Sequence, residues 1–125
     1  MSGYIPDGYT RRGFLRGIPR LYEDLRFTYR PILLAERSEL NSKLALADPK
    51  QIEKLAAEAA ARHLVSWDLA HDGSVLSITA ATLLRLQPSL FDRLYSVLHG
   101  RAASDEDSTG WADEPLPDEA VQQKN

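Results

Sequence analysis

The sequence predicts a mainly α-helical protein: a small domain of about four helices with an extended N-terminal arm, a short β element and a disordered acidic C-terminal tail. Three observations favour it. Apolar residues recur at helical spacing over much of residues 31–98, glycines and prolines interrupt any helical period in the first 24 residues, and the acidic excess lies in residues 101–125. We therefore expect an arm at 1–24, a mainly helical domain at 25–100 and a tail at 101–125.

Composition limits the classes of function. The chain has 125 residues, 43% of them hydrophobic and 26% charged, which is typical of one soluble domain. The absence of cysteine excludes disulfides and thiolate chemistry. No apolar run approaches the roughly 18 residues of a membrane helix. The start carries Pro6, Asp7 and several arginines in place of an apolar signal segment, so we expect a cytoplasmic protein with no membrane partner.

The arm and the strand that follows it differ in pattern. A turn is expected over Pro6–Gly8, and the glycines and proline beyond it are typical of extended chain. From Leu25 to Arg30, apolar and polar residues alternate strictly, which is the period of a strand with one buried face. Such a strand needs a pairing partner, and both the arm and the segment around Val75 are candidates.

Two helices are expected next. The first runs from Pro31 to Leu46, because proline at a first helical position sacrifices no backbone hydrogen bond. The second begins with Asp48 as N-cap and Pro49 in the first turn, is rich in alanine, and extends to Trp67. Its narrow apolar face is lined by alanines, which favours close packing against another helix.

Asp68, His71 and Asp72 lie within five positions of one another. A metal or acid/base site needs ligands that converge, and this cluster has neither helical i, i+4 spacing nor a distant third ligand. The dipeptide Asp72-Gly73 is a strong turn signal, so we favour a turn here. The chain also lacks a nucleophile elbow, a phosphate loop and a dinucleotide fingerprint. We predict no catalytic, metal or cofactor site and no enzymatic activity.

The last two helices follow this turn. Thr79 can cap a short helix over "AATLLRLQ", and Pro88 begins another that ends before Gly100. The second carries an apolar stripe, and we predict that this stripe, with Trp67 beside it, contacts a partner. Its members are Leu90, Phe91, Leu94, Tyr95 and Leu98. The alternative that these side chains form the core stays open.

Charge is divided unevenly along the chain. Residues 1–100 carry 13 Lys/Arg and 11 Asp/Glu, whereas residues 101–125 carry 2 and 7. In the arm, Arg11, Arg12 and Arg16 alternate with aromatic residues, a composition that suits nucleic acid or a protein interface. We favour a protein interface or a plain solvated face over nucleic acid, because the net balance of residues 1–100 is only +2. In the tail, Trp111 is a candidate anchor on a partner or on the chain's own basic surface, against the alternative of a plain linker.

Several segments, in order, resemble the small tail assembly proteins of long-tailed bacteriophages and prophages. The similarity spans about residues 4–100 and runs from "YIPDGYT" and "LRFTYRPILLAER" through "VSWDL" and an Asp-Gly turn to "ITAATLLRLQPSLFDRLYSVLHG", followed by an acidic tail. It is carried by Trp67, Gly73, Ile78 with Thr79, Leu86–Pro88 and Leu90–Gly100.

The resemblance implies a tail assembly chaperone. Such a protein is mainly helical, self-associates, and coats the tape measure protein in the host cytoplasm before the tail tube protein polymerises around it. A second possibility is a structural tail or connector component, which would use the arm to join neighbouring subunits. A third is a weak nucleic-acid-binding protein, which the modest charge balance makes the least favoured.

Overall fold

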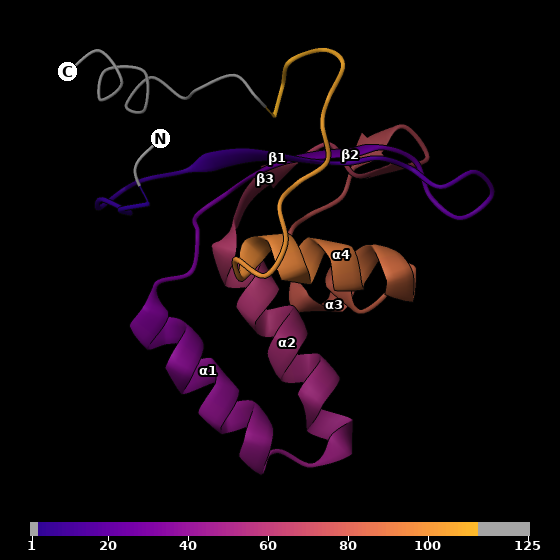
Figure 1. The fold of residues 1–125 in the computed structure, drawn as a ribbon. Coiled ribbons are helices and arrows are strands. Elements are labelled where there is room, and N and C mark those ends of the chain that lie inside the picture. The colour runs from indigo at the N-terminus through magenta and orange to yellow at the C-terminus, as the bar shows by residue number, and fades with distance from the viewer. Residues whose placement is uncertain (1–2, 113–125) are drawn as a thin grey trace.

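The computed structural model describes residues 3–112, and within them the fold is mixed α/β. In chain order the elements are β1 (Arg11–Leu15), β2 (Leu25–Tyr29), α1 (Leu34–Leu46), α2 (Pro49–His63), β3 (Leu64–Trp67), β4 (Ala70–His71), β5 (Ser74–Val75), α3 (Ala80–Leu83) and α4 (Pro88–Leu98). The prediction of a mainly α-helical protein was therefore wrong, since a three-stranded antiparallel sheet packs beside the helices (Figure 1).

The sheet has the order β1-β2-β3, with β2 at its centre. Arg11 pairs with Tyr29 and Leu15 with Leu25 across β1 and β2, and Phe27 pairs with Trp67 across β2 and β3. The predicted strand at 25–30 is confirmed. Its partners are the arm and the segment just after α2, whereas Val75 pairs within a separate β4-β5 hairpin.

Residues 11–15 of the predicted arm form β1, a strand that the sequence analysis did not assign, although the arm was one of the two candidate partners for the strand at 25–30. Gly13 hid this strand in the sequence, since glycine is depleted in strands. The structure explains why glycine stands there: a Cβ on Gly13 would lie within 3.0 Å of three atoms of the Phe27 ring. Phe27 is fully buried, and its ring lies against the backbone of β1. This close approach is possible because Gly13 has no side chain.

One error in the predicted fold concerns residues 64–67, which were expected to continue the helix that begins at Pro49. The helix ends at His63, and Leu64 adopts extended backbone angles with φ −79° and ψ 131°. The segment "LVSW" contains a β-branched and an aromatic residue, which favour a strand. The Arg30 amide donates to the His63 carbonyl at 2.8 Å, so the chain passes directly from α2 into the sheet.

Several local predictions are confirmed. The Thr79 hydroxyl accepts a hydrogen bond from the Thr82 amide and caps α3, and Pro88 opens α4. Asp72 and Gly73 both have positive φ, 51° and 80°, as a tight two-residue hairpin turn requires. Gly100 also has positive φ and follows the end of α4. The helix expected from Pro31 begins at Leu34.

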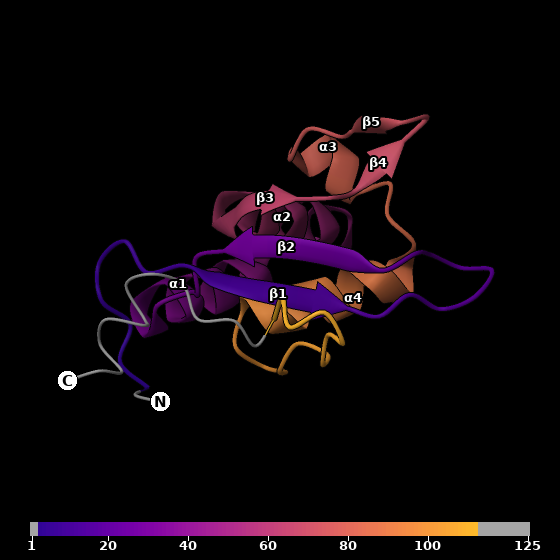
Figure 2. The same ribbon diagram turned by 90° about the horizontal axis from the view of Figure 1, so that it is seen from above.

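The described chain is built in three layers. Helices cover one face of the sheet, and the buried core between them includes Leu25, Phe27, Leu94 and Leu98. Residues 103–112, which we call the strap, pass the edge of β1 and continue over the far side of the sheet (Figures 1 and 2). The strap has no helix or strand. The acidic tail was predicted to be disordered from residue 101; residues 103–112 make hydrogen bonds to the sheet, and residues 113–125 lie outside the described part of the chain.

Candidate partner-binding surface

The apolar stripe predicted on α4 divides into a buried half and an accessible half. Leu90, Leu94 and Leu98 are 3%, 0% and 0% exposed and belong to the core. Trp67 is also buried, and its indole N–H donates to the Leu76 carbonyl at 2.7 Å. These four side chains hold α4 and β3 in the core, as the alternative interpretation of the stripe expects.

Phe91 and Tyr95 face the other way and line an apolar groove of about 530 Å³. We call it the helix groove, because its walls come from α1, α2, α3 and α4. The remaining lining side chains were not singled out as contact residues in the sequence; they are Leu44, Ile52, Glu53, Ala56, Leu83, Leu84, Leu86, Pro88, Asp92, Ser96 and Arg101.

The helix groove combines accessible apolar side chains with a charged rim. Leu84 is 50% exposed and Ile52 is 40% exposed, so water reaches both. Glu53, Asp92 and Arg101 supply charges around them. Apolar side chains with polar groups at the margin are what a groove for an amphipathic helix requires. Partial burial raises the pKa of the Tyr95 hydroxyl.

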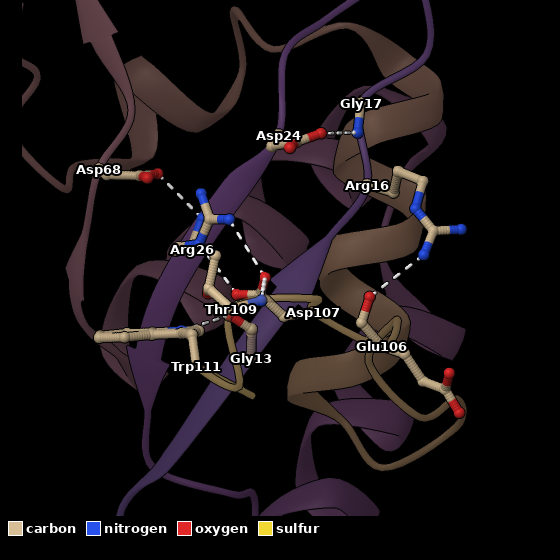
Figure 3. A network of polar contacts seen from close by, with 10 residues as sticks. All are labelled: Gly13, Arg16, Gly17, Asp24, Arg26, Asp68, Glu106, Asp107, Thr109 and Trp111. Atoms are coloured by element: carbon tan, nitrogen blue, oxygen red, sulfur yellow. Dashed lines mark hydrogen bonds and ion pairs between the residues drawn. The ribbon is translucent and has the colours of Figure 1, made fainter. Parts of the chain in front are cut away.

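A second candidate surface begins at the edge of β1 and continues over the outer face of the sheet, where the strap meets several arginines; Figure 3 shows Arg16 and Arg26 among them. Arg93 donates to the Asp105 carboxylate, to the Arg16 carbonyl at 2.9 Å and to the Tyr22 hydroxyl at 2.8 Å. The backbone amide of Arg16 donates to the same Asp105 carboxylate at 2.8 Å. Asp105 is thereby bound at the edge of β1.

The strap continues over the outer face of the sheet. Arg26 donates two hydrogen bonds to the Asp107 carboxylate, at 2.9 and 3.2 Å. The hydrogen bond from Arg26 holds the pKa of the Asp107 carboxyl at about 2, well below its usual value. The Trp111 indole N–H donates to the Gly13 carbonyl at 3.1 Å, and the Arg12 guanidinium lies 4.6 Å from the centre of the Trp111 ring. Trp111 thus docks on the chain's own basic surface.

The three arm arginines predicted to bind a partner have different surroundings. Arg12 stacks on Trp111, and the Arg16 side chain donates to the Glu106 carbonyl at 3.2 Å. Arg11 is exposed at the start of β1. Acidic strap residues lie against this side of the sheet, which reduces the basic surface that a nucleic acid would meet.

Two histidines are buried where α2 and α4 end. His63 and His99 have ring centres 5.9 Å apart, and the His99 Nδ1 bonds the Tyr95 carbonyl at 2.8 Å. Within the described residues, the His99 Nε2 has no hydrogen-bond partner. Burial lowers the pKa of His99. Residues 3–112 contain no group of three or more His, Asp or Glu side chains that could hold a metal ion.

The cluster Asp68, His71 and Asp72 forms a turn and a sheet contact. Asp68 accepts a hydrogen bond from the Arg26 amide at 2.9 Å, and His71 lies 3.3 Å from the Asp72 carboxylate at the exposed tip of the β4-β5 hairpin. These three side chains do not converge on one point, as the turn interpretation expects.

Comparison of the chain with protein-family models, with curated proteins and with solved structures finds no match. Over residues 3–112, no helix combines the length and the apolar character needed to cross a membrane.

Proposed function

We propose that this chain is a tail assembly chaperone of long-tailed bacteriophages or prophages, which binds the tape measure protein in the host cytoplasm and keeps it soluble until the tail tube protein polymerises. The observation that carries the proposal is the helix groove, a hollow of about 530 Å³ with accessible apolar side chains on three helices. A long helical client would otherwise expose its apolar stripe to water, and such a groove can cover it.

The segments that carry the resemblance build the walls of this groove or hold them in place. Leu86 and Pro88 line it at the start of α4, and Phe91 and Tyr95 line it further along. Trp67 and Thr79 fix the chain before and at the start of α3 through their hydrogen bonds. The resemblance and the groove thus rest on the same part of the chain, which supports one function for both.

A chaperone that covers a long client must bind it at many places. We therefore include self-association of this chain along the tape measure protein in the proposal, together with transfer of the client to the tail tube protein. The structural-component alternative had relied on an extended arm that joins subunits. Since residues 11–15 form β1, that alternative loses the feature that suggested it.

The proposal is tested by co-expressing the chain with a candidate client, a long helical tape measure protein, and measuring how much of that protein stays soluble. Leu84→Glu and Ile52→Glu each place a charge in the helix groove at a side chain that is already half exposed, so the fold tolerates them. Val75→Glu is the matched control, because Val75 is 64% exposed and lies on β5, outside the groove.

The wild-type chain and the Val75→Glu variant are expected to keep the client soluble, and the two groove variants to lose most of that effect. Equal solubilisation by all four chains would show that the groove does not bind the client. No solubilisation by the wild-type chain would refute the chaperone function itself.

A further inference from the structure

We infer that the arginine-rich outer face of the sheet is a second docking site. Its ligand is an extended acidic segment of a partner protein, and this segment contains a tryptophan. In the free chain the strap occupies the site in place of that ligand. The inference does not rest on the helix groove, because no residue of the strap lines that groove.

The strap itself defines the chemistry of the ligand. Asp105 binds Arg93 and the Arg16 amide, Asp107 binds Arg26 in a two-pronged contact, and Trp111 stacks under Arg12. Carboxylates held by two guanidinium N–H groups and rings covered by arginine are recurrent ways to recognise an acidic peptide. Each of these contacts could be made equally by a segment from another chain.

The strap binds as a docked peptide binds, not as part of the core. Within the described chain, the hydrophobic core cluster contains no strap residue. Only Asp107 of the strap is buried, whereas Trp111 is half-buried and the Asp105 side chain is 32% exposed. One backbone–backbone hydrogen bond joins the strap to β1, from the Asp105 amide to the Phe14 carbonyl. Such a contact can be exchanged without opening the core.

The receiving surface is pre-formed by rigid elements and extends past the strap. Arg26 lies on the central strand, where its guanidinium also covers the Phe14 ring at 4.9 Å, and Arg93 lies on α4. Beyond Trp111 the surface continues into a hollow of about 590 Å³ whose wall includes Arg11, Arg12 and Arg101. The described residues that line this hollow include no Asp or Glu.

A tethered strap competes strongly with any free peptide. A ligand joined to its site by a short linker acts at an effective concentration on the order of millimolar, so the wild-type chain hides the site from weak ligands. The test therefore uses the full-length chain with its strap released by Asp105→Asn, Asp107→Asn and Trp111→Ala. The probe is a fluorescent peptide with the sequence of residues 103–112, "ASDEDSTGWA".

Fluorescence anisotropy is expected to show that the released chain binds this peptide at least about ten-fold more tightly than the wild-type chain does. Binding should weaken as salt is added, because two ion pairs contribute. Arg26→Gln in the released chain should lower the affinity about ten-fold or more, while Arg85→Gln, an exposed arginine outside this surface, should leave it unchanged. A control peptide with Asn for both aspartates and Ala for the tryptophan should not bind.

Equal binding of the probe and control peptides to the folded triple variant would overturn the inference. An affinity for the probe that Arg26→Gln does not change would overturn it as well. If the triple variant does not fold, Asp105→Asn alone gives the same comparison, because its carboxylate is partly exposed and its loss leaves the core intact. A wild-type dimer that forms with rising concentration and that the released chain cannot form would identify the ligand as the strap of a second copy, and would overturn the inference of a different partner.

Discussion

The substitution Gly13→Ala tests whether residues 11–15 belong to the sheet. Gly13 does not have positive φ, so a Cβ causes no backbone strain there. The methyl group would instead meet the Phe27 ring within 3.0 Å, where ordinary contacts are 3.4–4 Å, and the fully buried ring cannot swing away. Overpacking of this kind costs about 1–3 kcal/mol. For a domain of this size that lowers the melting temperature by roughly 4 °C per kcal/mol.

Gly3→Ala is the matched control, because nothing lies within 4 Å of a Cβ at that position. It should change the free energy of unfolding by only a few tenths of a kcal/mol, about the size of the unfolded-state effect. Phe27→Leu shortens the ring that the new methyl group meets and costs about 1–2 kcal/mol alone. In the double variant the clash is relieved, so its loss of unfolding free energy should be about 1–2 kcal/mol smaller than the sum of the two single losses.

The assay is urea unfolding of the wild-type chain and the four variants, followed by circular dichroism, with the midpoint and slope fitted for each. A Gly13→Ala chain as stable as the Gly3→Ala chain would refute the placement of β1 against Phe27. Strict additivity of Gly13→Ala and Phe27→Leu would do the same, because residues that do not touch do not couple.

Three further outcomes are expected. The pKa of Asp107 is about 2 when folded and close to 4 when unfolded, so this ionised group stabilises the fold above about pH 4 and the contribution is lost between pH 4 and pH 2. In the Asp107→Asn variant the unfolding midpoint should therefore depend less on pH between pH 4 and pH 2. The same pH dependence in the variant and the wild-type chain would argue against the contact with Arg26. Burial lowers the pKa of His99, so stability falls as pH drops below about 6.5, where the unfolded chain takes up the proton. In the His99→Leu variant, stability should fall less between pH 7 and pH 5 than it does in the wild-type chain. Thermal unfolding at several pH values measures this difference. Trp67→Phe removes the 2.7 Å hydrogen bond to the Leu76 carbonyl and should cost about 1–3 kcal/mol in chemical unfolding, and a loss near zero would mean that water replaces the indole.

The parts of the fold that sequence reasoning found are those with a local signal. Strict alternation identified β2, proline and threonine marked the starts of α4 and α3, and Asp72-Gly73 marked a hairpin turn. Each of these signals acts within a few residues, so the pattern alone determines the local conformation.

The parts that were missed depend on contacts between distant residues. Gly13 reads as a strand breaker unless Phe27 is known to lie beneath it, and "LVSW" continues a helical pattern unless β2 is available to pair with it. The strap looks like an acidic tail until Arg26 and Arg93 are placed beside Asp107 and Asp105. Ion pairs between positions more than 80 residues apart, such as Arg26 with Asp107, leave no periodic trace.

The candidate site was only partly predictable for the same reason. Leu90, Leu94 and Leu98 lie on one face of α4. Helical spacing alone does not distinguish a face that packs in the core from a face that binds a partner. Phe91 and Tyr95 were found because they lie beside that face. Ile52 and Leu84 come from other helices, and only the packing of α2 and α3 against α4 brings them into the helix groove.

The most direct test of the proposed function co-expresses this chain with a long helical tape measure protein and measures the mass of the soluble material by size-exclusion chromatography with light scattering. The chaperone proposal predicts co-elution in one peak, with many copies of this chain for each copy of the client. Elution of this chain alone as a monomer, with the long protein in the precipitate, would contradict it.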